Sequence, residues 1–308
     1  MMKRAVIREV GLRDGLQMVT ADVPTDHKLE WIADAVSAGL TEIEVTSFVP
    51  PKTFPIFADA AAVADAALKV SGLSASALVV NLRGAQDAFA RGLRHINYVV
   101  SASEAHSGAN ARRTTAEAVA EFDRIVALRD DLGLQTAVEF SCGIATAFGC
   151  SLQGEVSLER VLDLATQMAG SGAAEIMLAD TVGYGTPGQV ERAFGALRQR
   201  LPEIRISAHF HDTRGLGLAN IAAALRVGVT RFDASIGGLG GCPYAPGATG
   251  NVNAEDAAYL LESEGFDTGI DIGRLLALRR KVERWLPGER FSGAIARAGL
   301  PINTTTFQ

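Results

Sequence analysis

The chain has 308 residues, of which 48% are hydrophobic, so its composition allows one sizeable core. Lys and Arg number 29 against 35 Asp and Glu, and the net charge of −6 argues against a nucleic-acid-binding surface or a basic membrane patch. The three cysteines, Cys142, Cys150 and Cys242, are too few for a disulfide framework. Because the N-terminus has no apolar run and no segment reaches the length of a membrane span, we expect a cytoplasmic protein.

Short β-branched or apolar segments alternate along the chain with longer alanine- and leucine-rich segments of helical period. The expected strands are Ala5–Val10, Glu42–Thr46, Ala75–Val80, His95–Val100, Gln135–Phe140, Glu175–Leu178, Arg205–Phe210 and Arg231–Ser235. The expected helices are Asp26–Ala38, Phe57–Val70, Ala85–Arg91, Thr115–Leu132, Leu158–Ser171, Pro187–Arg200, Leu218–Val227 and Ala254–Glu264. Strand–helix pairs repeated in this way predict an α/β fold, a (β/α)8 TIM barrel.

An open doubly wound sheet is the alternative architecture. It usually carries a glycine-rich turn after its first strand, and the segment Gly11–Gly15 does not match a dinucleotide-binding fingerprint. Ile272–Trp285 predicts an additional C-terminal helix beyond the last strand–helix pair. We therefore expect one catalytic domain over residues 1–286, followed by an irregular tail over residues 287–308.

The working residues of a TIM barrel stand at the C-terminal ends of its strands. His209 and His211 stand at the end of the seventh expected strand, and residues two apart on a strand project to the same face. Both imidazoles can therefore reach one metal ion, and Asp14, after the first strand, lies close by around a closed barrel. With an oxygen of Asn251 they form a mixed set of ligands suited to Mg²⁺, Mn²⁺ or Zn²⁺, among which the sequence does not choose.

Two further residues at this end of the barrel carry reactive or charged groups. Arg13 adjoins Asp14 and offers a permanently charged guanidinium that can stabilise an enolate or a carboxylate. Cys242 lies in a glycine-rich loop after the eighth strand, where a flexible lid is expected and where a thiol can donate or accept a proton. The other two cysteines are expected to be structural.

Four blocks of the sequence resemble the 3-hydroxy-3-methylglutaryl-CoA lyase family of TIM-barrel metallolyases. Between them they cover nearly the whole expected barrel, and the block around Cys242 is close to a family signature. The blocks are Glu9–Gln17, Glu44–Val49, His209–Thr213 and Gly238–Asn251.

The resemblance implies a cation bound by Asp14, His209, His211 and Asn251. It implies that Arg13 stabilises an enolate, that Cys242 acts as an acid or base, and that Glu44 and Asp180 support catalysis, with His209 or Asp180 as the base. It further implies a CoA-thioester substrate, contacted by residues in loops at the same end of the barrel, and a homodimer. The expected contacts to the coenzyme part are Gln17, Ser47 and Asn110.

The implied reaction is the cleavage of 3-hydroxy-3-methylglutaryl-CoA to acetyl-CoA and acetoacetate. The sequence departs from the family pattern at Ser141–Cys150, at Ala179 and at His106, positions that surround the expected acyl pocket. A lyase for citramalyl-CoA or another 3-hydroxyacyl-CoA is therefore an alternative. A Claisen-type synthase, a biotin-dependent carboxyltransferase domain and a non-catalytic barrel are weaker alternatives.

Overall fold

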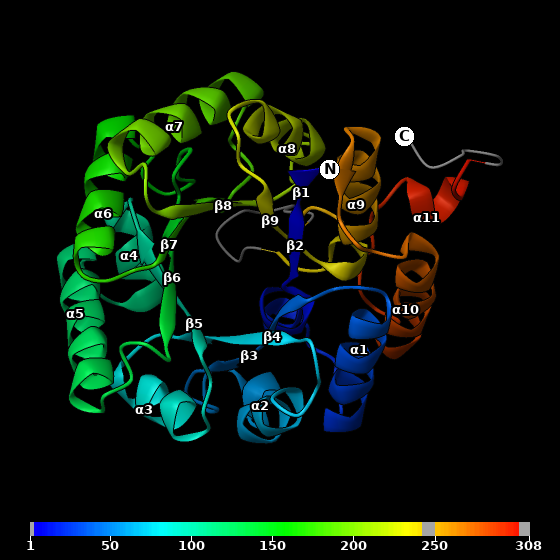
Figure 1. The fold of residues 1–308 in the computed structure, drawn as a ribbon, viewed down its shortest axis with the longest axis horizontal. Coiled ribbons are helices and arrows are strands. Elements are labelled where there is room, and N and C mark those ends of the chain that lie inside the picture. The colour runs from blue at the N-terminus through cyan, green and yellow to red at the C-terminus, as the bar shows by residue number, and fades with distance from the viewer. Residues whose placement is uncertain (1–2, 242–249, 302–308) are drawn as a thin grey trace.

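Eight parallel strands close into a barrel in the computed structural model, which describes residues 3–241 and 250–301. Each strand pairs with the strands before and after it in the chain, and the first pairs with the last, so the barrel has no free edge. Figure 1 shows the helices as an outer ring around these strands. The strands are β2 Val6–Glu9, β3 Glu42–Phe48, β4 Ser74–Val79, β5 His95–Ser101, β6 Glu139–Ala145, β7 Glu175–Asp180, β8 Arg205–Phe210 and β9 Arg231–Ala234.

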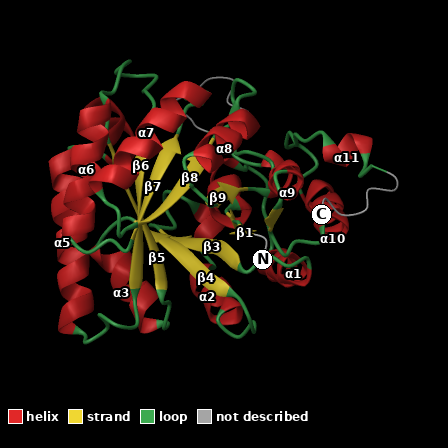
Figure 2. Ribbon diagram, turned by 45° about the horizontal axis from the view of Figure 1, so that its top comes forward, coloured by secondary structure: helices red, strands yellow, loops and turns green. Residues whose placement is uncertain are grey.

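The helices of the outer ring follow the strands in chain order and bury one face against them, as Figure 2 shows. In one example, the ring of Phe122 lies 5.3 Å, centroid to centroid, from that of Phe140 on β6, in an edge-on arrangement. The helices are α1 Thr25–Ser37, α2 Ala60–Ala67, α3 Leu82–Ala90, α4 Glu104–Ala111, α5 Thr115–Asp131, α6 Leu158–Gly170, α7 Pro187–Arg200, α8 Gly217–Arg226, α9 Ala254–Ser263, α10 Ile272–Trp285 and α11 Ile295–Ala298.

The predicted barrel and its additional helix α10 are confirmed, but one strand was placed wrongly. Gln135–Phe140 was expected to be the fifth strand, whereas β6 spans Glu139–Ala145. Val138 N–H instead donates to the carbonyl of Leu134, in a turn, and pairing with β5 begins only at Glu139. Cys142 therefore lies in the middle of β6, buried, rather than in the loop beyond it.

Four short strands and α-helices of the described residues were not expected from the sequence: β1 Lys3–Arg4, β10 Phe266–Asp267, α4 and α11. β1 and β10 pair in parallel as a separate small sheet. Helix α4 follows β5 directly. Helix α11 lies in the tail that was expected to be irregular, and the proposed division at residue 286 stays a prediction.

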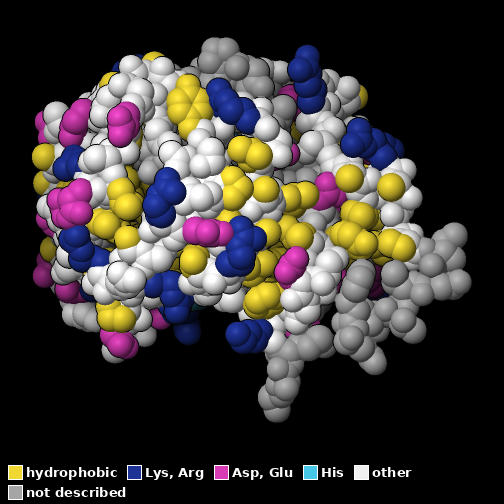
Figure 3. Space-filling model, turned by 90° about the horizontal axis from the view of Figure 1, so that it is seen from above, with side chains coloured by type: hydrophobic (Ala, Val, Ile, Leu, Met, Phe, Trp, Pro, Cys, Tyr) yellow, Lys and Arg dark blue, Asp and Glu magenta, His cyan; other side chains and the backbone are white. Residues whose placement is uncertain are grey.

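The face drawn in Figure 3 carries basic, acidic and apolar side chains interspersed with one another, so neither sign of charge dominates it. Across residues 3–241 and 250–301, none of the helices combines the length and the apolar character that crossing a membrane requires.

Candidate active site

Asp14 is placed by an unusual turn at the end of the first barrel strand. Gly11–Gly15 forms a single π-helical turn, in which the N–H groups of Asp14 and Gly15 donate to the carbonyl of Val10 at 2.7 and 3.2 Å. A Cβ on Gly11 would lie 2.3 Å from Oε1 of Glu9, so the turn requires glycine there. The turn brings the Arg13–Asp14 pair to the C-terminal end of the barrel.

The two histidines and Asn251 come from neighbouring backbone segments. His209 lies on β8, and His211, just beyond it, forms an isolated antiparallel bridge with Asn251. The backbone at Gly250, next to Asn251, packs directly against the backbone at Gly238. A Cβ on Gly250 would lie only 2.5 Å from the carbonyl oxygen of Gly238, so this close approach depends on the missing side chain of glycine. The contact fixes Asn251 beside the end of β8.

Asp14, His209 and His211 form a cluster with the dimensions of a metal site. Their ligand atoms lie within 4.8 Å of one another, and Oδ2 of Asp14 is 3.6 Å from Nε2 of His211 and 4.0 Å from Nε2 of His209. Nδ2 of Asn251 donates to Asp14 at 2.8 Å, while its buried Oδ1 has no hydrogen-bond partner among the described residues. A buried amide oxygen without a partner, beside a carboxylate and two imidazoles, fits the donor set of a divalent cation.

The charges around Asp14 keep it ionised, as a metal ligand must be. Burial disfavours the carboxylate, but the Arg13 guanidinium and the two histidines outweigh burial and hold the pKa of Asp14 well below its ordinary value. For His209, burial disfavours the charged ring, but the hydrogen bond to Asp233 and the charge of Asp14 outweigh it and raise its pKa.

Arg13 is held on two sides at the edge of the cluster. Its Nε donates to Glu44 at 2.5 Å and its Nη1 to Asp14 at 2.5 Å. Glu44 is fully buried on β3 and also accepts a hydrogen bond from Asn97 of β5 at 2.7 Å. Burial raises the pKa of Glu44, and the nearby Arg13 opposes that rise. Glu44 therefore contacts Arg13 and fixes its orientation, while its role in catalysis stays a prediction.

Asp180, at the end of β7, binds the loop that follows it. Its two carboxylate oxygens accept the N–H groups of Tyr184 and Gly185 at 2.8 and 2.9 Å. Burial raises the pKa of Asp180, and these hydrogen bonds oppose the rise. Its role as a base stays a prediction.

The three residues expected to contact the coenzyme, Gln17, Ser47 and Asn110, differ in burial and lie on different elements. Ser47 is buried and its hydroxyl lies 3.4 Å from the carbonyl of Leu78, whereas Asn110 is exposed on α4 and Gln17 is partly exposed after the π-helical turn. Their contacts to a coenzyme stay predictions. Cys242 lies outside the described residues.

The sequence did not single out three polar residues at or near the site: Asn97, Asp233 and Thr146, the last named only as part of Ser141–Cys150. Each is a polar residue in or just after an otherwise apolar strand, and that pattern could have marked it as a candidate site residue. Thr146 was hidden by the misplaced fifth strand. Its hydroxyl lies 3.1 Å from that of Ser101, which in turn lies 3.0 Å from Nδ1 of the buried His106.

Comparisons with known proteins agree with this geometry. A family model described as HMGL-like matches residues 4–282. The hydroxymethylglutaryl-CoA lyase YngG of Bacillus subtilis is 40% identical over 281 residues, 91% of this chain and 93% of that protein. The (R)-citramalyl-CoA lyase of Chloroflexus aurantiacus is 39% identical over 287 residues, covering 90% of this chain and 89% of that protein.

Solved structures show the same similarity in three dimensions. An HMG-CoA lyase from Acinetobacter baumannii, in complex with coenzyme A and 3-methylmalate, matches with a TM-score of 0.90 and 38% identity, covering 98% of this chain and 97% of that one. The closed barrel and the cluster at the C-terminal ends of its strands define a TIM-barrel enzyme with a candidate metal centre. The chain belongs to the HMGL-like family of carbon–carbon lyases.

Proposed function

We propose that this protein cleaves 3-hydroxy-3-methylglutaryl-CoA to acetyl-CoA and acetoacetate with the help of a divalent cation, Mg²⁺ or Mn²⁺, with Zn²⁺ as a further candidate. The observation that carries the proposal is the cluster of Asp14, His209 and His211 directly beside Arg13, in a chain of this family. The CoA-thioester substrate is supported by the coenzyme A bound in the similar lyase structure.

The residues of the site divide the work of a retro-Claisen cleavage. Asp14, His209, His211 and Asn251 hold the cation, which when bound polarises substrate oxygens and lowers the pKa of the 3-hydroxyl. Asp180 is then the base that removes the hydroxyl proton, because Nε2 of His209 faces the cation and its Nδ1 contacts Asp233. The bond between C2 and C3 then breaks.

Cleavage leaves acetoacetate and the enolate of acetyl-CoA. Arg13, fixed by Glu44, provides a guanidinium for the enolate oxygen without reorganising during the reaction. Cys242 supplies the proton that completes acetyl-CoA. The thioester makes the carbanion accessible, which accounts for the use of CoA rather than a free acid.

Cleavage of citramalyl-CoA, to acetyl-CoA and pyruvate, is the second candidate. It is supported by the similarity to the Chloroflexus enzyme, which is nearly equal to that of the Bacillus enzyme. The second candidate is also consistent with His106, a buried residue at which the sequence departs from the family pattern beside the expected acyl pocket. Its Nδ1 lies 3.0 Å from the hydroxyl of Ser101.

The test is to incubate purified protein separately with both thioesters and Mg²⁺, and to measure acetyl-CoA together with acetoacetate or pyruvate. We expect a kcat/KM for 3-hydroxy-3-methylglutaryl-CoA at least tenfold above that for citramalyl-CoA, loss of activity with EDTA, and recovery on adding Mg²⁺ or Mn²⁺. The reverse preference would support the second candidate. Turnover unaffected by EDTA would contradict the role of the cation.

We also propose a homodimer, which the resemblance implies, to be measured by light scattering of the purified chain. The cytoplasmic location stays a prediction from the sequence. A Claisen-type synthase is a weaker alternative, distinguished by consumption of acetyl-CoA together with a 2-keto acid.

A further inference from the structure

Asp233 lies directly behind one of the two histidines of the cluster. It stands on β9 opposite His209 on β8, in the register that the two strands share. Its Oδ2 is 3.2 Å from Nδ1 of His209, and the two residues are 3% and 6% exposed. Since Nε2 of His209 is the nitrogen that faces Asp14, the contact with Asp233 occupies the opposite side of the ring.

The two imidazoles of the cluster are therefore unequal. Nδ1 of His211 is buried and has no hydrogen-bond partner among residues 3–241 and 250–301, whereas Nδ1 of His209 has a carboxylate. A ring nitrogen that donates to a carboxylate leaves the other nitrogen deprotonated and able to bind a metal ion. Within the described part of the chain, His209 has this support and His211 does not.

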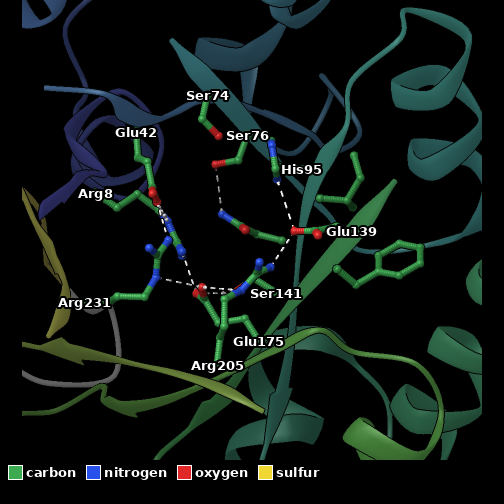
Figure 4. Close-up of a pocket in the computed structure, with 13 residues that line it drawn as sticks. Arg8, Glu42, Ser74, Ser76, His95, Glu139, Ser141, Glu175, Arg205 and Arg231 are labelled. Carbon is green, nitrogen blue, oxygen red and sulfur yellow. Dashed lines mark hydrogen bonds and ion pairs between the residues drawn. The ribbon is translucent and has the colours of Figure 1, made fainter. Parts of the chain in front are cut away.

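Asp233 is itself held from the opposite end of the barrel. Nη1 of Arg8 lies 3.5 Å from its Oδ1, an ion pair too long for a hydrogen bond. Arg8 belongs to a network of buried or half-buried charges at the N-terminal ends of the strands, here called the basal network, which lines a cavity of about 130 Å³ (Figure 4). The basal network consists of Arg8, Glu42, Glu175 and Arg231.

The basal network fixes Arg8 firmly. Its Nη2 donates to Glu175 at 2.5 Å, and Glu175 also accepts from Arg231, Ser141 and Ser207 at 3.1, 2.9 and 2.8 Å. In Figure 4 the side chains of Arg8 and Arg231 converge on Glu175. The partners of Glu175 fix that carboxylate, and its short hydrogen bond to Nη2 in turn anchors the Arg8 guanidinium beside Asp233.

We infer that Asp233 is a positioning residue for the metal centre. It accepts the Nδ1 proton of His209, which turns Nε2 toward Asp14, and Arg8 holds Asp233 in place from the basal network. The inference rests on the proposed metal site and adds a chain of contacts that joins the two ends of the barrel, from Glu175 through Arg8 and Asp233 to His209.

The first experiment titrates Mn²⁺ alone into the wild-type chain and into Asp233→Asn by isothermal calorimetry. The amide is nearly the same size as the carboxylate but is a weaker acceptor, so we expect Mn²⁺ to bind about 10- to 100-fold more weakly. The control is Asp59→Asn, a half-buried aspartate whose carboxylate accepts hydrogen bonds from Thr25 and Lys28 of α1, away from the cluster. Its affinity for Mn²⁺ should equal that of the wild type.

The second experiment needs no variant and decides the matter if Asp233→Asn does not fold. The chain has five histidines, so ¹⁵N-histidine labelling of the metal-free protein, at a pH high enough for the imidazoles to be neutral, gives few NMR signals to assign. We expect the proton of His209 on Nδ1 and none on Nε2.

The outcomes separate this inference from the proposed function. A proton on Nε2 of His209, or an affinity of Asp233→Asn within twofold of the wild type, would overturn the role of Asp233 alone. If the wild type itself bound no Mn²⁺, the proposed metal centre would fall, and this inference with it.

Discussion

At the scale of single residues, Arg13 has a geometry that lysine does not reproduce. Its guanidinium contacts Glu44 through Nε and Asp14 through Nη1 at the same time, and both carboxylates keep their places through these contacts. A lysine keeps the positive charge but has one compact ammonium group, which does not span both partners. Shape as well as charge is therefore required at this position.

We accordingly predict that Arg13→Lys lowers kcat about 100-fold or more, because a preorganised donor to the enolate is lost. The measurement is acetyl-CoA formation at saturating substrate. Arg226→Gln, which removes an exposed guanidinium paired with Glu191, serves as the control and should keep wild-type kcat. A kcat of Arg13→Lys within threefold of the wild type would contradict the enolate role.

The buried carboxyl group of Glu255 leads to a separate prediction, about how the free energy of unfolding depends on pH. Burial raises the pKa of Glu255 to about 7, against an ordinary value of 4.5. Its carboxyl group also accepts a hydrogen bond from the N–H of Gly237, just after β9. Between these two pH values the folded chain keeps the proton and the unfolded chain loses it. The free energy of unfolding therefore falls as pH rises from 4.5 to 7, and this contribution is constant above 7.

Glu255→Gln removes this titration. Between pH 4.5 and pH 8 the variant should lose less stability than the wild type, by up to about 3 kcal/mol, as measured by urea unfolding at both pH values. Glu155→Gln changes an exposed glutamate and should follow the wild type. Identical pH dependence for Glu255→Gln and the wild type would show that Glu255 does not hold a proton in the folded chain.

At the scale of elements, the π-helical turn after β2 connects packing to chemistry. Gly11 is enclosed by Oε1 of Glu9 and the ring of Trp31, which would lie 2.3 and 2.7 Å from an added Cβ. Glu9 is fully buried and also accepts the N–H of Ile236, so it has little room to move. The turn and the loop after β9 thus share one buried carboxylate.

We predict that Gly11→Ala destabilises the chain by about 1–3 kcal/mol through overpacking, and that it weakens Mn²⁺ binding because Asp14 lies in the same turn. Urea unfolding and calorimetry measure the two effects. Gly195→Ala, in α7 with open space around the added methyl group, should stabilise the chain by about 1 kcal/mol. Unchanged Mn²⁺ affinity in Gly11→Ala would separate the turn from the metal centre.

At the scale of the whole molecule, residues 287–301 are tied to the wall that carries the site. Ser292 N–H donates to the carbonyl of Gly237 at 2.8 Å, and its carbonyl accepts from Asn253 at 2.7 Å. Asp256 of α9 accepts the N–H groups of Ala294 and Ile295 at 2.6 and 2.9 Å. The segment thus hydrogen-bonds to the backbone at Gly237 and to the side chain of Asn253, two described residues close to Asn251.

A chain that ends at residue 286 should therefore be less stable by about 1–3 kcal/mol, the cost of leaving the buried Asp256 without these partners. Its kcat should fall as well, because Gly237 and Asn253, close to Asn251, lose hydrogen bonds to Ser292. A chain that ends at residue 301 is the matched control and should retain both properties. Thermal unfolding and acetyl-CoA formation measure them, and equal values for the two chains would show that the segment is dispensable.

The sequence by itself predicted the barrel and the three residues of the candidate metal site. Strand and helix periods are local properties, and closing eight parallel strands brings their C-terminal ends together, so Asp14 meets His209 and His211 although nearly 200 positions separate them. The catalytic and coenzyme roles of these and the other predicted residues stay predictions, and Cys242 lies outside the described part of the chain.

Only the tertiary structure decided the start of β6 and the partners behind the cluster. Pairing with β5 sets the first residue of β6, a non-local interaction that overrides the β-forming character of Gln135–Phe140. The contact between Asp233 and His209 likewise depends on the register of two adjacent strands, which no local pattern encodes. Residue type and spacing thus identify what can bind a cation, whereas strand register decides which side chains hold the ligands in place.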